Sequence, residues 1–252
     1  MKNMFDLTGK TAIVTGANTG LGQGVCVALA QAGANIVGVG RSPMDETEKL
    51  VKEAGAKFLA VKADLISKEP INRIINEAVN AFGQIDILVN NAGIIRRNDA
   101  IDYTEEDWDD ILNTNLKTLF FFCQAAAKQF LKQNTSGKII NIASMLSYQG
   151  GIRVPAYTAS KSGVLGLTRA LANEWAKHGI NVNGIAPGYM VTNNTAALRA
   201  DENRSAEILA RIPAGKWGTP EDIGGTAVFL ASDAANYIHG FTIAVDGGWL
   251  AR

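Results

Sequence analysis

The stretch TAIVTGANTGLG, residues 11–22, decides the fold. It begins with five residues that are apolar or β-branched and lack polar alternation, which predicts a strand buried on both faces. Gly16, Gly20 and Gly22 follow this strand and open a helix-like segment. Glycine accepts a positive φ and lets a phosphate approach the backbone, and the helix start behind it offers unpaired N–H groups. The stretch therefore predicts a strand, a phosphate-binding turn and a helix.

The same alternation recurs along the chain. Further short runs rich in Ile and Val lie at 35–40, 57–63, 86–91, 138–144, 181–187 and 242–248. Amphipathic segments lie between them, at 20–32, 70–82, 105–133, 157–178 and 220–231. Parallel strands need crossover connections, so strands that alternate with helices predict a parallel sheet covered on both faces. We therefore expect one α/β domain over residues 1–252, a Rossmann-like doubly wound sheet of about seven strands flanked by helices.

Residues 188–219 depart from this alternation. They follow the predicted strand at 181–187 and contain helical pieces instead of a further strand. A long insertion at the carboxyl end of a parallel strand often covers a ligand site. We expect this segment to be a substrate lid.

Composition excludes several classes of partner. The 252 residues include 24 basic and 24 acidic ones, so there is no electrostatic case for nucleic acid or for an anionic membrane. No apolar segment reaches the roughly 18 residues of a spanning helix, and the N-terminus lacks a signal-peptide pattern, so we expect a cytoplasmic protein. Cys26 and Cys123 lie in apolar runs, as buried free thiols do, and the two histidines do not cluster, so we expect no metal site.

Cofactor contacts are expected where the strands end, because doubly wound sheets bind ligands at the carboxyl ends of their strands. The loop spacing G-x-x-x-G-x-G differs from the commoner dinucleotide fingerprint, so the loop alone is also compatible with a plain strand-to-helix turn. The expected contacts from the glycine loop are Gly16, Asn18, Thr19, Gly20, Leu21 and Gly22. Those from the next three strand ends are Arg41, Asp64, Leu65, Asn91, Ala92 and Gly93.

Arg41 stands where the second strand ends. An acid at this place binds the ribose hydroxyls of NAD, whereas an arginine accommodates the phosphate of NADP. Arg41 therefore favours NADP, but a solvated surface role explains it equally well, and the glycine loop contains no second basic residue. The choice of cofactor stays open on these residues.

Tyr157 and Lys161 stand four residues apart, and on a helix they share one face. A nearby ammonium stabilises a phenolate and lowers the tyrosine pKa, which would make Tyr157 a general acid or base near neutral pH. Ser144 ends the preceding strand and can donate a hydrogen bond to a substrate carbonyl oxygen. These three side chains can donate a proton to a carbonyl oxygen, or remove one from an alcohol, while a dinucleotide cofactor transfers the hydride.

Together these motifs resemble the short-chain dehydrogenase/reductase family over the whole chain. The matching residues are TGANTGLG (15–22), NNAG (90–93), Asn115, Ser144, YTASK (157–161) and PGYMVT (187–192). The resemblance implies that Tyr157 is the catalytic acid or base, that Lys161 lowers its pKa and holds the nicotinamide ribose, and that Ser144 orients the carbonyl. It also implies that Asn115 holds a water linked to Lys161. The nicotinamide would meet Pro187, Gly188, Met190 and Thr192, and the protein would be a homotetramer.

The segments between the motifs resemble one subgroup of the family, notably NIASMLSYQGGIRVPAYTASKSGV, RIPAGKWGTPEDI and AVDGGWLAR. That subgroup interconverts 3-deoxy-2,5-diketo-hexonate and 2-keto-3-deoxygluconate during uronate and pectin breakdown, and it is associated with NAD. Cofactor choice between NAD and NADP stays open because of Arg41. Three alternatives remain: a dehydrogenase of another polyol or gluconate, a 3-oxoacyl thioester reductase, and a dinucleotide-sensing protein without activity.

An acidic substrate needs a cation, and the arginine fork matches a carboxylate bidentately. Arg153 precedes Tyr157 by four residues, and we expect it to bind the carboxylate, with Arg97 as the second candidate. The other expected substrate contacts are Ser144, Met145, Gln149 and Tyr157.

Overall fold

The computed structural model describes residues 3–252 and contains one parallel sheet in the order β3-β2-β1-β4-β5-β6-β7. Its strands are β1 (Thr11–Thr15), β2 (Asn35–Gly40), β3 (Phe58–Lys62), β4 (Ile87–Asn90), β5 (Gly137–Ile142), β6 (Ile180–Pro187) and β7 (Thr242–Val245). Every predicted run coincides with or overlaps a strand, and the predicted doubly wound α/β fold is confirmed. The strand order reverses between β1 and β4, which is where such sheets open a crevice for ligands.

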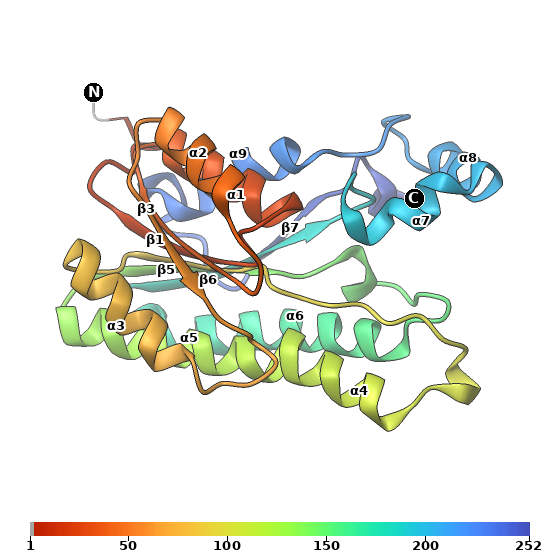
Figure 1. Cartoon of the computed structure of the whole chain (residues 1–252), viewed down its shortest axis with the longest axis horizontal. Helices are drawn as coiled ribbons and strands as arrows, with labels where there is room; N and C mark the ends of the chain where they lie inside the picture. Colours follow the sequence, from red (N-terminus) through yellow and green to blue (C-terminus); the bar gives the residue numbers. More distant parts are fainter. Residues whose placement is uncertain (1–2) are drawn as a thin grey trace.

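Helices cover both faces of the sheet (Figure 1). One face carries α1 (Gly20–Gln31), α2 (Asp45–Glu53) and α9 (Pro220–Ala231). The other carries α3 (Ile71–Phe82), α4 (Glu105–Leu112), α5 (Thr118–Gln133) and α6 (Pro155–Trp175). The short 3₁₀ helices are η1 (Ala100–Asp102), η3 (Met145–Ser147), η4 (Ala176–His178), η5 (Asn193–Thr195), η6 (Asp233–Ala235) and η7 (Trp249–Ala251). Among residues 3–252, no helix is both long and apolar enough to cross a membrane.

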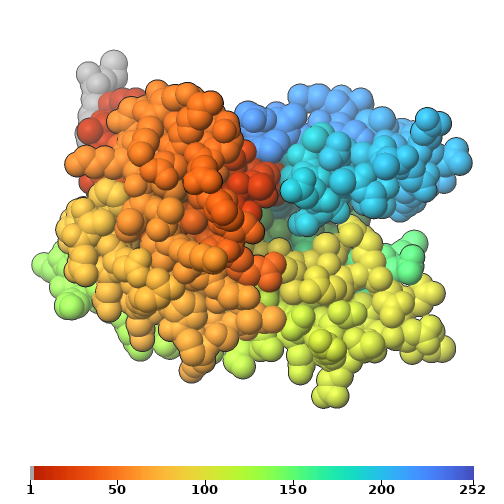
Figure 2. All heavy atoms as spheres, viewed as in Figure 1, coloured from red at the N-terminus to blue at the C-terminus, as the bar shows by residue number. Residues whose placement is uncertain are grey.

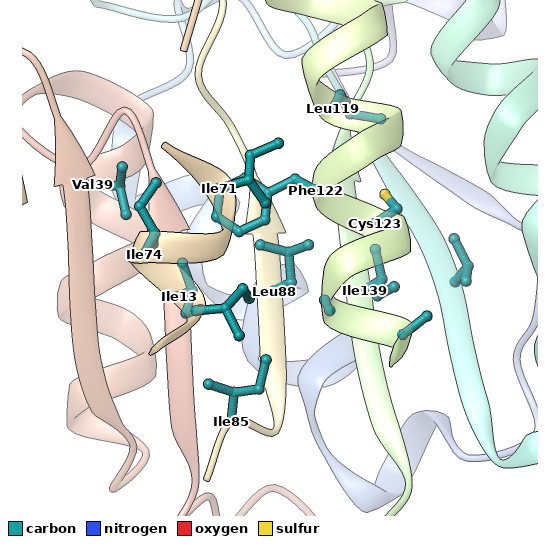
Figure 3. Packing of buried hydrophobic residues seen from close by; sticks show 14 of the residues in the cluster. Ile13, Val39, Ile71, Ile74, Ile85, Leu88, Leu119, Phe122, Cys123 and Ile139 are labelled. Atoms are coloured by element: carbon teal, nitrogen blue, oxygen red, sulfur yellow. The ribbon is translucent and has the colours of Figure 1, made fainter. Parts of the chain in front are cut away.

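The sheet divides the core into two halves, and β1 shows how. Ile13 packs with the helices of one face, and its neighbour Val14 packs with those of the other, because successive side chains of a strand point to opposite sides. Figure 3 shows Phe122 of α5 packed close to Ile13 and Leu88 of the sheet. Burial on both faces explains why the strands lack polar alternation in the sequence.

The segment predicted as one helix over 105–133 is divided in the structure. A π-helical turn, η2 (Asn113–Lys117), separates α4 from α5. Such wide turns occur frequently at functional sites, because they redirect a side chain that a regular helix would place elsewhere. Here the turn contains Asn115, whose side chain is fully buried.

Residues 188–219 form a separate lobe that contains α7 (Ala196–Ala200) and α8 (Glu202–Arg211). The two stems of this lobe are paired, since Val191 N–H donates to the Gly218 carbonyl at 2.8 Å and Gly218 N–H donates to the Tyr189 carbonyl at 2.9 Å. A small third core, with Ile208 and Trp249 at its centre, lies beneath it. Figure 2 shows the lobe in cyan and blue, facing the yellow loop after β4 across a hollow.

Candidate active site

The glycine loop has the backbone conformation that its sequence predicts. Gly16 and Gly20 have φ values of 66° and 58°, in the left-handed region that favours glycine. A Cβ on Gly16 would lie 2.8 Å from Nδ2 of Asn91, so a side chain there would displace the neighbouring loop. Asn91 Nδ2 in turn donates to the Thr15 carbonyl at 2.9 Å, which fastens the NNAG loop to the glycine loop.

The start of α1 is available to an anion. Thr19 is the N-cap residue, but its side chain makes no capping hydrogen bond. The first N–H groups of α1 therefore lack a side-chain acceptor, and together with the helix dipole they suit a pyrophosphate. Gly22 packs directly against the Gly16 carbonyl. Its lack of a side chain therefore allows the tight turn between β1 and α1.

A cavity of about 270 Å³ opens at the carboxyl ends of β1, β4, β5 and β6. Most of the predicted cofactor contacts line it, namely Gly16, Asn18, Thr19, Gly20, Leu21, Asn91, Ala92, Gly93, Tyr157, Lys161, Pro187, Gly188, Met190 and Thr192. Ser144 lines it as well. The predicted contacts that do not line it are Gly22, Arg41, Asp64 and Leu65. Leu65 is buried in the core, so its side chain is structural.

Arg41 and Asp64 border a neighbouring, wider cavity together with Lys62 and Arg73. Arg41 Nη1 lies 3.8 Å from Asp64 Oδ2, and both side chains are more than half exposed. A solvent-exposed pair at this distance holds its partners weakly. The Arg41 guanidinium can therefore leave Asp64 for a phosphate without a large energetic cost.

Tyr157 and Lys161 lie on the first turns of α6, which begins at Pro155. Burial lowers the pKa of Lys161 to about 8, because the charged form loses its hydration. Lys161 Nζ donates to the Ile142 carbonyl at 2.6 Å and lies 5.7 Å from the centroid of the Tyr157 ring. The ammonium is thus held beside the phenol but is hydrogen-bonded to the end of β5.

The pKa of Tyr157 differs from the sequence-based expectation. Burial raises the pKa of Tyr157 above its ordinary value, and this is only partly opposed by a hydrogen bond with Ser144 and by the charge of Arg97. Lys161 is not among the causes of the shift, so the structure does not show the lowering that we expected from it. At neutral pH the phenol carries its proton and can act as a donor.

Ser144 is placed to donate a hydrogen bond of its own. Its Oγ accepts from the Leu146 N–H at 3.1 Å, which leaves the hydroxyl hydrogen for another partner. The side chain is buried and lies at the N-terminal end of η3, directly after β5. Ser144 and Tyr157 therefore place two hydroxyl groups, hydrogen-bonded to each other, at the same point of the cavity.

Asn115 holds the loop that follows β4. Its Oδ1 accepts from Ile94 N–H at 2.8 Å, and its Nδ2 donates to the Ile94 carbonyl at 3.0 Å and to Ser160 Oγ at 3.2 Å. Both amide hydrogens are thus used within the protein. These contacts place Gly93 between Asn115 and Lys161, where a Cβ would lie 3.8 Å from Lys161 Nζ.

A second cavity of about 480 Å³ lies on the other side of Tyr157, beneath the lobe of residues 188–219. Ser144, Met145 and Tyr157 line it, as the sequence predicted. Arg97 lines it too, and its Nη2 donates to the Asn194 carbonyl of the lobe at 3.2 Å.

Arg153, the first choice for a carboxylate ligand, is not brought to this cavity. Its Nε lies 2.8 Å from Asp99 Oδ1, and the pair is exposed on the rim. The backbone of Arg153 is left-handed, with φ of 64°. Of the two arginines predicted for the carboxylate, only Arg97 lines this cavity.

Arg211 and Trp249 are among the residues of the second cavity that were not predicted from the sequence. Gln149, predicted to meet the substrate, does not line the cavity and accepts hydrogen bonds from both of them. No local sequence signal marks this contact, because its members come from three segments that meet only in the fold. Within residues 3–252, no three His, Cys, Asp or Glu side chains gather as they would around a metal ion.

Comparison with known proteins gives consistent matches along the chain. A family model described as enoyl-(acyl carrier protein) reductase matches residues 16–250. The 2-dehydro-3-deoxy-D-gluconate 5-dehydrogenase of Escherichia coli (strain K12) is 63% identical over 248 residues, 98% of each chain.

Two solved structures add information on ligands. One, from Agrobacterium tumefaciens, is of a protein provisionally named a 2-deoxy-D-gluconate 3-dehydrogenase and has NADP bound. It is 56% identical, covers 100% of both chains and superposes with a TM-score of 0.94. The other is a gluconate 5-dehydrogenase from Burkholderia cenocepacia J2315 in complex with NADP and tartrate, 36% identical over 99% of this chain and 98% of that one, with a TM-score of 0.93.

Proposed function

The chain belongs to the short-chain dehydrogenase/reductase family, and from this we propose that it interconverts 3-deoxy-2,5-diketo-hexonate and 2-keto-3-deoxygluconate with NAD(P). This is the activity of a 2-dehydro-3-deoxy-D-gluconate 5-dehydrogenase, the name carried by the relative from Escherichia coli. One observation carries the proposal: Ser144 and Tyr157 line both cavities. A cofactor in the first and a ketone in the second would meet at these two hydroxyl groups.

The residues of the first cavity fit a dinucleotide. The start of α1 presents free N–H groups to a pyrophosphate, and Gly93 leaves open the space beside Lys161 Nζ that a side chain would fill. We assign to Lys161 the binding of the ribose hydroxyls and to Pro187, Gly188 and Thr192 contacts with the nicotinamide. When bound, the nicotinamide supplies the hydride in reduction and accepts it in oxidation.

The chain's own residues move the proton. In the reductive direction Tyr157 donates its phenolic proton to the ketone oxygen, and the Ser144 hydroxyl donates a hydrogen bond to the same oxygen. One hydride and one proton convert the ketone to the alcohol. In oxidation the phenolate accepts the hydroxyl proton, so the raised pKa of Tyr157 favours reduction at neutral pH.

We propose that the enzyme accepts NADPH as well as NADH. Support comes from Arg41, which is exposed and only loosely paired with Asp64. An arginine at this position can bind the additional phosphate of NADP. The two solved relatives described above hold NADP.

The lining of the second cavity favours an acid over an acyl chain. It contains Arg97 and Arg211, which form no ion pair within residues 3–252, whereas Arg204 is paired with Glu207. The excess of positive charge suits the carboxylate of a sugar acid, which an acyl thioester lacks.

Initial-rate measurements test the proposal. The diketo acid is offered with NADH and with NADPH, at equal concentrations, and cofactor oxidation is followed by absorbance. We expect turnover with both cofactors and little with a 3-oxoacyl thioester. Protein that binds cofactor but oxidises neither with the diketo acid would contradict the proposal.

We also propose a cytoplasmic homotetramer, as is usual for the family. The exposed aromatic side chains Tyr237 and Phe241 lie beside the edge strand β7, and they are 99% and 63% exposed in the single chain. Aromatic residues exposed next to a sheet edge are typical of a surface that another subunit covers. Light scattering after gel filtration measures the assembly directly.

A further inference from the structure

Arg211 is held on the wall of the second cavity by contacts from three separate segments. It is the last residue of α8, and the carbon of its guanidinium group lies 4.0 Å from the centroid of the Trp249 ring. Gln149 Oε1 accepts from Trp249 Nε1 at 3.2 Å and lies 3.5 Å from Arg211 Nη2. The lobe, the loop after η3 and the segment after β7 therefore converge on one cation.

The contact with the Trp249 ring does not occupy the N–H donors of Arg211, and among the described residues only Nη2 donates to a side chain, that of Gln149. A guanidinium group on an aromatic ring uses its flat face, while its N–H donors point outward in the plane. Within the described part of the chain, Arg211 forms no ion pair with a carboxylate. Arg204, on the same helix and lining the same cavity, differs in this respect, because its Nη1 lies 2.8 Å from Glu207 Oε2.

The backbone beneath Arg211 is held as well. Arg252 Nη2 donates to the carbonyls of Ala210 and Arg211 at 3.0 Å and 2.6 Å. Trp249 is buried, and its ring packs against Tyr189 at 4.8 Å between centroids. A cation at the C-terminal end of a helix is also favoured by the helix dipole. These contacts hold the end of α8 and the Trp249 ring against which the Arg211 guanidinium lies.

We propose that Arg211 binds the carboxylate of the keto sugar acid and that Gln149 and Trp249 position it. The inference rests on the proposed function and names the residue that selects an acid. Arg97 lies in the same cavity but comes from the loop after β4. The substrate would place its ketone at Ser144 and Tyr157 and its carboxylate at Arg211. The lobe would then provide selectivity for acidic substrates, and α6 would provide the proton donor.

The test compares kinetics with an acidic and a neutral substrate. Arg211→Met, Arg211→Lys and Arg204→Met are measured with the diketo acid and with its primary amide, which has the same shape but no charge. We expect Arg211→Met to raise KM for the acid about tenfold or more, with kcat little changed, because a charge-assisted bidentate pair is lost. For the amide, and for Arg204→Met with either substrate, we expect changes within about twofold.

Arg211→Lys keeps the charge but not the fork, so KM for the acid should rise several-fold. Thermal unfolding and cofactor binding show whether Arg211→Met folds. If it does not, Arg211→Lys provides the test in its place. Gln149→Ala should raise KM for the acid by a smaller factor, and the double variant Gln149→Ala with Arg211→Met should be no worse than Arg211→Met alone. That non-additivity identifies Gln149 as a positioning residue.

Two outcomes overturn the inference, and they differ from each other. If the unmodified enzyme reduces the diketo acid but Arg211→Met affects acid and amide equally, the proposed function stands and Arg211 is not the carboxylate ligand. If the unmodified enzyme reduces neutral carbonyl compounds but not the diketo acid, the proposed function fails, and the inference fails with it.

Discussion

Lys161 lies one helical turn from Tyr157, yet its ammonium donates to the Ile142 carbonyl at 2.6 Å instead of approaching the phenol oxygen. Burial then acts on the two groups in opposite senses. It raises the pKa of Tyr157 and lowers the pKa of Lys161 to about 8, because burial disfavours the charged form of each group. The pair is therefore set for proton donation from the phenol.

Tyr157→Phe should abolish most of the activity without affecting the fold. It removes the hydroxyl that donates the proton, and loss of a general acid lowers turnover about a hundredfold or more. Cofactor binding, measured by quenching of intrinsic fluorescence, should stay close to that of the unmodified enzyme. Tyr148→Phe is the matched control, because Tyr148 is half-exposed and its hydroxyl donates to the Thr242 carbonyl at 3.4 Å. Near-normal turnover in Tyr157→Phe would remove Tyr157 from its assigned role.

The two directions of the reaction should respond oppositely to pH. Because the pKa of Tyr157 lies above its ordinary value of 10.0, the phenol is protonated throughout the neutral range. Reductive kcat should therefore stay flat between about pH 6 and pH 8 and fall only in alkaline solution, while oxidative kcat should rise with pH. Stopped-flow single-turnover rates measure this step directly. A reductive rate that already falls between about pH 6 and pH 8 would show that the phenol ionises much earlier than its burial indicates.

Arg41→Ala should separate the two cofactors. The loss of the guanidinium should lower kcat/KM for NADPH about tenfold or more and leave the value for NADH within about twofold. Unfolding in urea should be almost unchanged, since the exposed pair with Asp64 contributes little. Arg73→Ala is the control from the same cavity, because Arg73 Nη2 donates to the Lys62 carbonyl and its Nη1 pairs with Glu77. An equal loss with both cofactors would contradict the assignment of Arg41 to the phosphate.

Arg153→Gly should have little effect on catalysis or stability. The substitution removes an exposed ion pair with Asp99, which contributes roughly 0–1 kcal/mol. It also relieves a left-handed backbone that costs a residue other than glycine about 1 kcal/mol. We expect the free energy of unfolding to change by less than about 1 kcal/mol and KM for the diketo acid to stay within about twofold. A large rise of KM confined to acidic substrates would return Arg153 to the carboxylate site.

The fold could be predicted because its signals are local. Each strand is a short apolar run, and the turn at Gly16 is specified by neighbouring residues in the sequence. The helix α2 was missed because it is strongly polar and buries only Thr47 and Val51, which gives no apolar stripe. The π-helical turn at Asn113–Lys117 also left no periodic signal, because it depends on the contacts of Asn115 with Ile94.

The substrate side could be predicted only in part, because it depends on side-chain direction. Arg153 and Arg97 were both plausible from their distance along the chain to the motifs. In the structure Arg153 is paired with Asp99 on the rim and Arg97 lines the second cavity, and neither placement can be inferred from spacing. Arg211 became visible only when α8 was placed against Trp249.

The backbone hydrogen bonds that pair Tyr189 and Val191 with Gly218 hold the two ends of the lobe together. The lobe can therefore be treated as a cassette, a single segment that can be replaced by the corresponding segment of a related enzyme. A loop whose ends are held together closes on itself, so its interior can be exchanged without pulling on the strands that carry Ser144 and the glycine loop. An exchanged cassette would need to keep Thr192, which lines the cofactor cavity, and Ile208 and Ile212, which pack on Trp249 beneath it. Substrate preference in this protein could thus be re-engineered by replacing one contiguous segment, with the hydride and proton chemistry inherited unchanged.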